Sequence, residues 1–558
     1  MNRSIKFIGG LAITLSLFSC VNEQKETVSP FKDVLNFNSE IGYLDGSLTK
    51  KLEMDDKIES TQISAPNWEV ELKPFLDANF NKPANKGKYA RTEVKSDLSG
   101  FRDVRWVAKE DNLLVTEAIY RYNATECVSA MIRIEKTSAA YDHFETLSYV
   151  KNSGYSIENE QVLSHVTNEN FNLMAEFDGK PQPWRMFFEI GDNQVIPVNF
   201  DLKPTKDGYS LLFHQGKEVI EMAASKESGV YHVEVPVFQS FLTFVITGKG
   251  MTGKFHNLDK GDDYIIPFTA LKLPYAAIVG DYSSQESANF DGKWETHFDT
   301  ADEAYAAIGL FDRLGDDLIG TFATETGDYR FLQGKVVGDS FSLSTFDGSH
   351  LFLFTGQING DKITNGKFYS GIHYQTTWSA KKNDSFKLIN PDEMTSLREG
   401  VEKIDFSFPN MEGNMISLSN EKYKDKVVVL QILGSWCPNC MDETRYFNEL
   451  NAKYNARGLE IIGLAFERST DFNKAKESLQ KATKDLGVSY PMLIAGTPKN
   501  SQKALPMITG IKSYPTSIIL DKNGKVVKIH TGFYGPSTGT YYDNYTREME
   551  ALMDELLD

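Results

Sequence analysis

The chain has 558 residues, 41% hydrophobic and 24% charged, with 59 basic against 77 acidic side chains and a formal net charge of −18. At roughly 100–200 residues per domain, this length predicts three or four domains. The ordinary composition excludes wholesale disorder, a collagen-like fibre and a polytopic membrane protein. An acidic chain without a basic run is a poor phosphate binder, so no nucleic-acid partner is expected. Four cysteines are too few for a disulfide scaffold.

The first twenty residues have the features of an export signal. A basic start precedes the apolar stretch 7–18, which is too short to span a hydrocarbon core of roughly 30 Å as a helix. The stretch ends in Leu17-Phe18-Ser19-Cys20, which resembles the lipobox of bacterial lipoproteins and implies lipid on Cys20. We therefore expect a signal peptide at 1–19 and a tether at 20–30, with the protein anchored in the periplasm or cell envelope. The alternative is an ordinary secretory signal with a chance cysteine.

Residues 31–175 are predicted to be a β-rich domain and carry no motif with recognisable chemistry. Cys127 lies on the strand face opposite the apolar side chains of its run and lacks a sequence partner once Cys20 is lipidated. We therefore expect a half-buried structural thiol there. The predicted helix is 67–80, and the predicted strands are 102–107, 113–122, 127–134 and 143–150.

Residues 176–381 are predicted to form one antiparallel β domain, a barrel or a sandwich. In the second half, turn signals recur about every ten residues, with alternating strands such as 341–344 between them. Aromatic residues here could line a ligand cavity, but a packed core is their commoner role. His350 and His373 have no spaced partner and are not expected to bind metal. The turn signals are 326–328, 338–339, 347–348, 359–361 and 365–366, and the aromatics are Phe346, Phe352, Phe354, Tyr369, Tyr374 and Trp378.

A polar stretch at 382–403 is predicted to be a linker. Residues 404–558 then have the pattern of an α/β sandwich with a mixed sheet. The run 426–433 is continuously apolar, as in a parallel strand buried on both faces, and Asn523-Gly524 predicts a hairpin. The predicted strands are 426–433, 459–466, 516–520 and 526–529, and the predicted helices are 442–454, 472–486 and 549–556.

The sequence Trp436-Cys437-Pro438-Asn439-Cys440 joins the first of these strands to the first helix. Zinc would need two further ligands, and this domain offers only His530, so no metal is expected. A helix N-terminus presents unpaired N–H groups and partial positive charge, which stabilise a thiolate. Cys437 is therefore the expected attacking thiol, and Cys440, one turn further on, is expected to be buried and to resolve the mixed disulfide.

These residues resemble the TlpA-like thiol-disulfide oxidoreductases, which have a thioredoxin fold. Trp436 and Pro438 belong to the matching motif, and Tyr514-Pro515 matches the cis-proline loop of the fold. The resemblance implies that this loop pairs with the substrate chain, and it assigns a characteristic glutamate to Glu443. That glutamate either tunes Cys437 or simply favours the helix N-terminus.

The chain departs from thioredoxin where a buried aspartate is replaced by Gln431. Glu467, at the end of the neighbouring strand, is a candidate substitute for the missing proton relay, and the alternative is an exposed strand-end carboxylate. The stretch 490–507 is expected to hold an element that minimal thioredoxins lack. The glycine-rich segment 532–539 is expected either to border the active site or to form a surface turn.

The sequence thus predicts a membrane-anchored oxidoreductase that reduces protein disulfides through a Cys437–Cys440 redox pair, without other cofactors. The resemblance further implies a membrane electron donor. One alternative is a ligand- or partner-binding lipoprotein with an accessory redox domain. A peroxiredoxin-like peroxidase is disfavoured because Gly434 and Leu430 stand where that class has a hydroxyl residue and a proline.

Overall fold

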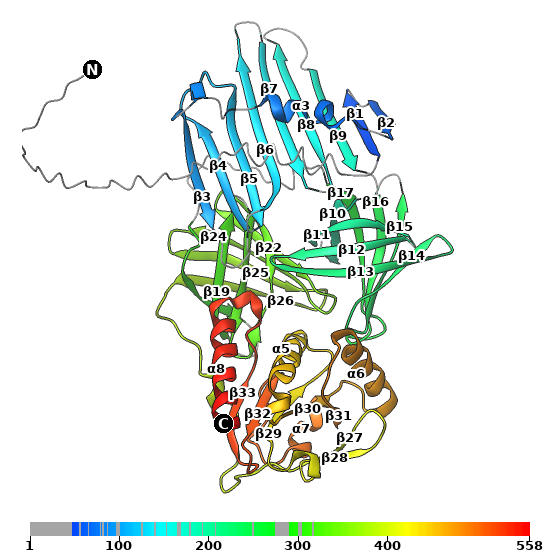
Figure 1. Cartoon of the computed structure of the whole chain (residues 1–558), viewed down its shortest axis with the longest axis vertical. Helices are drawn as coiled ribbons and strands as arrows, with labels where there is room; N and C mark the ends of the chain where they lie inside the picture. The colour runs from blue at the N-terminus through cyan, green and yellow to red at the C-terminus, as the bar shows by residue number, and fades with distance from the viewer. Residues whose placement is uncertain are drawn as a thin grey trace, which may run out of the picture.

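The computed structural model describes residues 47–558. Gaps in the description fall at 55–56, 65, 79, 81–82, 86, 96–100, 124–125, 139–140, 152, 164–168, 178–179, 192–193, 207, 248–249, 274–288, 300–303 and 315–316. The predicted signal peptide, Cys20 and the tether lie outside the described residues. The predicted fold class is confirmed: antiparallel β domains precede a C-terminal α/β domain (Figure 1).

The first unit is an antiparallel sheet in the order β2-β1-β9-β8-β7-β6-β5-β4-β3. The predicted helix is observed as two short helices, α2 (Trp68–Glu71) and α3 (Lys73–Asp77). The break lies before Pro74, which is tolerated in the first turn of α3 but would interrupt a continuous helix. Each predicted strand overlaps an observed one. The strands are β1 (Leu48–Met54), β2 (Lys57–Ile63), β3 (Tyr89–Lys95), β4 (Phe101–Ala108), β5 (Val115–Asn123), β6 (Glu126–Thr137), β7 (Tyr141–Val150), β8 (Gly154–Leu163) and β9 (Glu169–Phe177).

The second unit is a closed antiparallel barrel, here called barrel 1. Inward residues alternate with outward ones, as in β11, where Ile196, Val198 and Phe200 are buried. The strands are β10 (Gln182–Gly191), β11 (Gln194–Thr205), β12 (Gly208–Gln215), β13 (Glu218–Glu227), β14 (Val230–Glu234), β15 (Ser240–Thr247), β16 (Gly250–Asn257) and β17 (Ile265–Lys272).

The third unit, barrel 2, is a sheet whose ends are joined by pairing of β19 with β20. Two separate sheets therefore occupy the range in which the sequence suggested one domain. The predicted turn at 365–366 is wrong: Asn365, at φ 54°, lies in a bulge within β25. The strands are β18 (Lys293–Asp299), β19 (Tyr305–Leu314), β20 (Asp317–Thr324), β21 (Gly327–Asp328), β22 (Leu332–Val337), β23 (Ser340–Phe346), β24 (Leu351–Asn359), β25 (Lys362–Ser370) and β26 (Tyr374–Lys382).

Barrel 2 has its own core, and three of its residues, Phe346, Leu351 and Leu353, pack into the core of barrel 1. Phe346, at the end of β23, packs its ring 4.9 Å from Phe188 and 5.0 Å from Phe255 of barrel 1. Gln215 donates a hydrogen bond to the Phe346 carbonyl at 2.6 Å. Phe346, Phe354 and Trp378 are thus core residues, whereas Tyr374 is exposed.

The C-terminal domain contains a mixed sheet in the order β31-β30-β29-β32-β33, in which β29, β30 and β31 are parallel. The hairpin at Asn523-Gly524 is confirmed between β32 and β33. The strands are β27 (Ser407–Pro409), β28 (Met415–Ser417), β29 (Val427–Leu433), β30 (Leu459–Phe466), β31 (Met492–Gly496), β32 (Thr516–Leu520) and β33 (Val526–Thr531), and the helices are α5 (Pro438–Tyr454), α6 (Phe472–Leu486), α7 (Ser501–Ala504) and α8 (Thr540–Leu557).

Every residue of β29 is buried, as the apolar run predicts for a strand covered on both faces. Val427, Val429 and Leu433 pack with α5, α6 and α8, and the intervening residues pack with the segment around α7. Gln431 therefore points toward α5, the helix that begins at Cys437. The extra element expected in 490–507 corresponds to β31 and α7.

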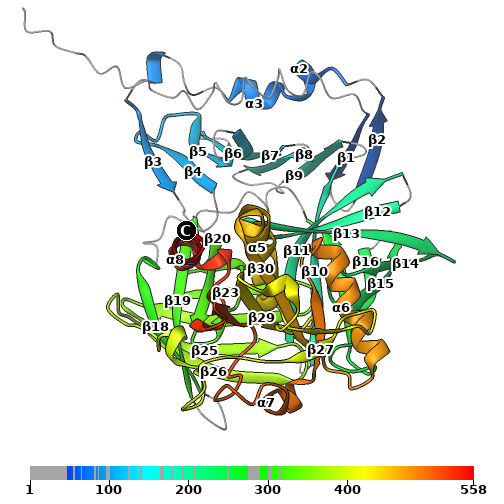
Figure 2. The ribbon, with the colours of Figure 1, turned by 60° about the horizontal axis from the view of Figure 1, so that its bottom comes forward.

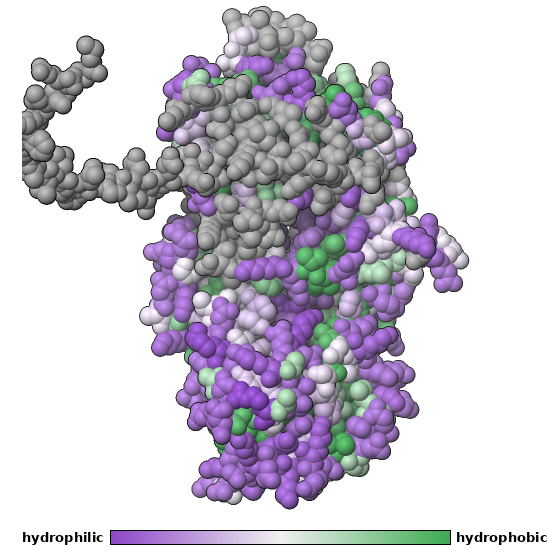
Figure 3. Space-filling view, in the orientation of Figure 1, coloured by the Kyte–Doolittle hydropathy of each residue, from purple (hydrophilic) through white to green (hydrophobic). Residues whose placement is uncertain are grey.

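The predicted linker packs against the C-terminal domain. Asp392 lies 2.6 Å from the ring of His530, and the backbone of Arg398 donates to the Met507 carbonyl at 2.8 Å. The barrels lie between the N-terminal sheet and the C-terminal domain (Figures 1 and 2), and α5 lies at the end of the C-terminal domain nearest them (Figure 1). The outer face of the C-terminal domain is mostly hydrophilic (Figure 3). Among the described helices, none is long and apolar enough to cross a membrane.

Candidate active site

Cys437 is the N-cap residue, directly before the first residue of α5. Its backbone is extended, with φ −104° and ψ 110°, and its sulfur accepts a hydrogen bond from the Cys440 backbone N–H at 3.3 Å. Pro438 occupies the first turn, where a missing N–H costs nothing. The free N–H groups and partial positive charge of the helix start therefore lie at the sulfur.

Cys440 lies below Cys437 in the core and has no exposed surface, whereas Cys437 is 7% exposed. Both side chains are free thiols. Burial, together with the hydrogen bond and charge of Cys437, raises the pKa of Cys440 well above that of an ordinary thiol. An outside reactant can therefore reach only Cys437, and Cys440 needs a nearby base to lose its proton.

The Tyr514-Pro515 loop lies against Cys437. The peptide bond between these residues is cis, and the Tyr514 carbonyl lies 3.5 Å from the Cys437 sulfur. This brings the two sequence landmarks, which are 77 residues apart, into contact.

Trp436 forms one side of the site. Its indole N–H donates to the Phe466 carbonyl at 3.0 Å, and Arg468 stacks over its ring at 4.6 Å. A side chain at Gly434 would meet the indole nitrogen at 2.3 Å. The packing of Trp436 therefore requires glycine at this position, where peroxiredoxin-like enzymes carry a hydroxyl residue.

A buried polar cluster lies beneath Cys440. Gln431 donates to Glu443 at 3.0 Å and accepts from the Tyr490 hydroxyl at 2.8 Å. Glu443 is fully buried, and this burial, only partly opposed by the hydrogen bond from Gln431, raises its pKa to about 8. Its charge contributes to the raised pKa of Cys440. Glu443 therefore lies in the buried cluster with Gln431 and acts on Cys440, whereas the sequence suggested either that it tunes Cys437 or that it favours the helix N-terminus.

Glu467 is buried rather than exposed, at 2% of its surface, so the alternative of an exposed strand-end carboxylate is wrong. Its carboxylate accepts from the backbone N–H of Ser435 at 3.0 Å and from the Ser435 hydroxyl at 2.7 Å. Burial raises its pKa to about 7, and the bonds from Ser435 oppose this rise. Glu467 thereby fixes the turn that precedes Trp436.

The turn between β20 and β21 of barrel 2 docks on this site. Ser513 donates to the Thr326 carbonyl at 3.3 Å, and the Asn439 side chain donates to the Asp328 carbonyl at 3.1 Å. Gly327, at φ 145°, is so close that a side chain there would meet the Asn439 amide at 2.1 Å. The sequence identifies 326–328 only as a turn, and no sequence signal indicates that it covers the motif.

The glycine-rich segment 532–539 also lies at this junction. Gly532 donates to the Pro515 carbonyl at 2.8 Å, and the buried Ser537 hydroxyl bonds to the Asp328 carboxyl. The segment is therefore not a surface turn.

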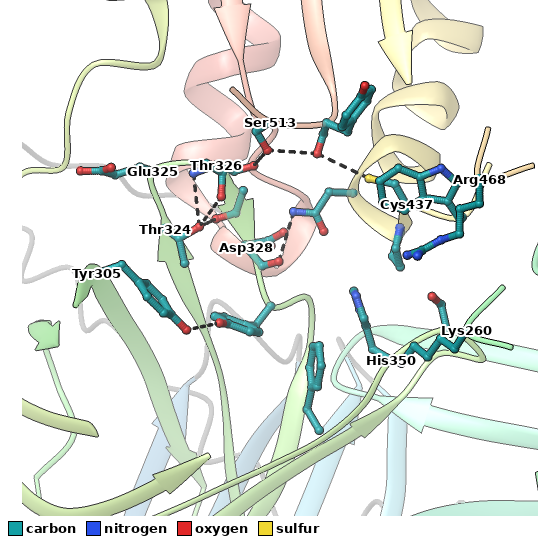
Figure 4. Close-up of a pocket in the computed structure, with 18 of the residues that line it drawn as sticks. Lys260, Tyr305, Thr324, Glu325, Thr326, Asp328, His350, Cys437, Arg468 and Ser513 are labelled. Atoms are coloured by element: carbon teal, nitrogen blue, oxygen red, sulfur yellow. Dashed lines mark hydrogen bonds between the residues drawn. The ribbon is translucent and has the colours of Figure 1, made fainter. Parts of the chain in front are cut away.

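Cys437 opens onto a cavity of about 460 Å³ formed by three domains (Figure 4). Phe352 and His350, both singled out by the sequence, line it, but Phe346 and Trp378 do not. In the described part of the chain no cluster of three metal-ligating side chains occurs. Further lining residues that the sequence did not indicate include Lys260, Tyr305, Thr324, Glu325, Tyr329 and Arg468.

The sequence model of the Redoxin family matches residues 399–543. The thiol-disulfide oxidoreductase ResA of Geobacillus thermodenitrificans is 31% identical over 140 residues, covering 25% of this chain and 73% of that protein. ResA of Bacillus thuringiensis is 33% identical over 129 residues, covering 23% of this chain and 67% of that protein. A solved thiol:disulfide interchange protein DsbE from Chlorobium tepidum is 26% identical with a TM-score of 0.23, covering 28% of this chain and 99% of that chain.

The chain is thus a thiol-disulfide oxidoreductase with a C-terminal thioredoxin fold. More narrowly, it belongs to the TlpA-like thiol-disulfide oxidoreductase family, which confirms the resemblance found in the sequence. The match covers the C-terminal domain and the last residues of the linker before it, so the N-terminal sheet and both barrels lie outside the match.

Proposed function

We propose that the protein is an exported, lipid-anchored reductase of protein disulfides, with Cys437 as attacking thiol and Cys440 as resolving thiol. The observation that carries this proposal is the pairing of one cysteine at a cavity wall and helix start with a second, fully buried cysteine one turn below it. The roles differ because only the outer sulfur is accessible.

In this reaction the Cys437 thiolate attacks one sulfur of the substrate disulfide, the substrate S–S bond breaks, and the departing thiolate takes a proton. Cys440 then loses its proton and attacks the Cys437 sulfur, which releases the second substrate thiol. Two electrons pass to the substrate, and the enzyme is left with a Cys437–Cys440 disulfide. The backbone of Tyr514 lies beside the reacting sulfur, where an extended substrate segment can pair.

Glu443 is the proposed acceptor of the Cys440 proton. Its carboxyl lies in the same dry cluster, and a base whose pKa is close to the working pH transfers protons efficiently. Glu467 is bound to Ser435, so its proposed role is to position the turn before Trp436.

Glu443→Gln should slow the resolving step on the order of 10²-fold, the lower end of general acid–base effects. Because the pKa of Glu443 is about 8, the carboxylate fraction grows as pH rises through 8, and the native rate should rise with it. This rise should disappear in the variant. Rapid-quench decay of a preformed mixed disulfide, measured from pH 6 to 9, gives the rate. Glu467→Gln is the control and should keep the pH dependence; if it loses that dependence instead, Glu467 is the proton acceptor.

The proposed direction is reduction, fed by a membrane electron donor, as the family resemblance implies. Redox proteins of this fold span potentials from about −270 to −120 mV. We expect the Cys437/Cys440 couple to titrate as one two-electron couple nearer the −270 mV end, because a reductant must be poised below its substrates. Titration of the full chain against glutathione or dithiothreitol buffers, read by thiol labelling, measures it. A potential near −120 mV would indicate an oxidase, and the absence of a couple would contradict the dithiol mechanism.

The anchor proposed at Cys20 rests on the lipobox-like end of the apolar stretch. It would hold the enzyme at a membrane in the periplasm or cell envelope, within reach of the donor. The mass of the N-terminal peptide of the isolated protein distinguishes an acylated Cys20 from an unmodified one.

The second candidate function is ligand or partner binding by the barrels, with redox chemistry as an accessory. One observation favours it: barrel side chains form much of the cavity at Cys437. The peroxidase alternative has no such support, because Gly434 cannot carry a side chain beside Trp436.

A further inference from the structure

The cavity of about 460 Å³ is the approach to Cys437 that the docked barrel leaves open. Its size lies within the range of small-ligand sites, roughly 300–1,000 Å³. The carbonyls of Thr326 and Asp328 accept hydrogen bonds from Ser513, the neighbour of Tyr514, and from Asn439, two residues after Cys437. The reacting disulfide must therefore enter the cavity, which favours a small disulfide or an extended segment over a bulky folded surface.

Two cations from different domains face this cavity. Lys260 comes from the turn between β16 and β17 of barrel 1, and its ammonium lies 4.9 Å from the Tyr264 ring centroid. Arg468 follows β30 and lies over Trp436. Neither forms an ion pair with a carboxylate of the described residues. Burial lowers the pKa of Lys260 to about 8, so it is still mostly protonated at pH 7.

The acidic groups of the cavity are engaged or distant. Burial raises the pKa of Asp328 to about 7, and its carboxyl bonds to Ser537. Asp259, next to Lys260, is held by the Gln239 backbone N–H at 3.4 Å. In Figure 4, Arg468, Lys260 and His350 lie on the Cys437 side, and Glu325 lies at the opposite end. The lining beside the reactive sulfur therefore carries the cations Lys260 and Arg468. The carboxylates that act on them, Asp259 and Asp347 on Lys260 and Glu467 on Arg468, lie outside the lining and beyond ion-pair distance. Desolvated cations favour an anionic partner there.

We propose that the cavity selects disulfides that carry a carboxylate near the reacting sulfur, with Lys260 and Arg468 binding that carboxylate while Cys437 attacks. The inference rests on the dithiol chemistry of the proposed function. As there, two electrons pass from the Cys437 and Cys440 thiols to the substrate disulfide. The same chemistry could come from a low-molecular-weight acidic disulfide or from an acidic peptide segment that bears a cystine.

The test uses the reduced full-length protein and three small disulfides: 3,3′-dithiodipropionate, neutral 2-hydroxyethyl disulfide and cationic cystamine. For each disulfide, the second-order rate constant of the variant is divided by that of the native protein. This division cancels the differences in leaving-group pKa between the compounds. Lys260→Gln should lower the acidic-to-neutral rate ratio roughly tenfold, the effect of losing one charge-assisted contact. Lys226→Gln is the matched control: its ammonium lies 5.0 Å from the Tyr231 ring, also on barrel 1, outside the cavity.

A second arm compares cystine peptides flanked by glutamate or by glutamine. An acidic preference among the small disulfides that Lys260→Gln removes supports a low-molecular-weight source, and a preference confined to the peptides supports a peptide source. Equal rates for all charges, or an unchanged ratio in Lys260→Gln, overturn the inference. If native protein reduces no disulfide of any charge, the proposed function fails instead.

Discussion

Cys437→Ser should abolish disulfide reduction by the full-length protein, with a loss on the order of 10³-fold or more, the scale seen when an enzyme loses its nucleophile. The reason is geometric. Cys437 lines the cavity, whereas Cys440 is fully buried and its thiol keeps its proton because its pKa is strongly raised. A serine hydroxyl at 437 would not ionise at neutral pH and could not form a mixed disulfide.

An insulin-reduction assay with dithiothreitol as electron source measures this loss, together with turnover of a small disulfide. Cys127→Ser is the control. Cys127 is buried in β6 of the N-terminal sheet, and its sulfur lies 3.3 Å from the Ser129 carbonyl, so its loss should leave activity within about twofold. Retention of activity in Cys437→Ser would mean that the motif is not the reactive centre. Intact ligand binding without redox activity would favour the binding-lipoprotein alternative.

Arg330→Met should be the most destabilising single change at the domain junction. The guanidinium is 6% exposed and contacts three carboxylates: Glu218 of barrel 1 at 2.7 Å, Asp347 of barrel 2 at 3.1 Å and Asp442 of α5 at 3.0 Å. Burial alone would lower its pKa, but the charges of Asp442, Glu218 and Asp347 raise it. Methionine fills a similar volume but leaves buried carboxylates uncompensated, which costs about 3–5 kcal/mol.

Urea unfolding of the full chain, with hydrogen exchange read on the first turns of α5, measures this loss at the junction. Arg445→Met is the matched control, because Arg445 also pairs with Asp442, at 2.5 Å, but is 44% exposed, so its loss should cost less than about 1 kcal/mol. Adding Asp442→Asn to Arg330→Met should recover part of the stability, since one uncompensated charge is removed. Equal stability of the Arg330 and Arg445 variants would contradict the role of Arg330.

Local pattern was enough to predict the C-terminal domain. The continuous apolar run at β29, the helical spacing in α5 and α6 and the Asn523-Gly524 turn depend on neighbours in sequence, and the structure has these elements where they were expected. The proximity of Cys437 to the Tyr514-Pro515 loop also follows from the fold, because the loop precedes β32, the strand that pairs with β29.

Burial could not be predicted from single positions. Glu443 and Glu467 look alike in sequence as carboxylates near strand and helix ends, yet one bonds to Gln431 beneath Cys440 and the other to Ser435. What separates them is the direction of each side chain relative to the closed sheet and helix, and that direction is set only when the layers pack.

Periodicity and motif spacing are local properties, and they were sufficient to indicate a redox-type α/β domain with a cysteine pair at a helix start. That barrel 2 covers this site, and that Lys260 and Arg330 belong to its surroundings, follows only from how the domains pack. These contacts join segments such as Asp328 and Asn439, which are 111 residues apart. No pattern within either segment encodes the other, because their meeting depends on how barrel 2 and the C-terminal domain pack together.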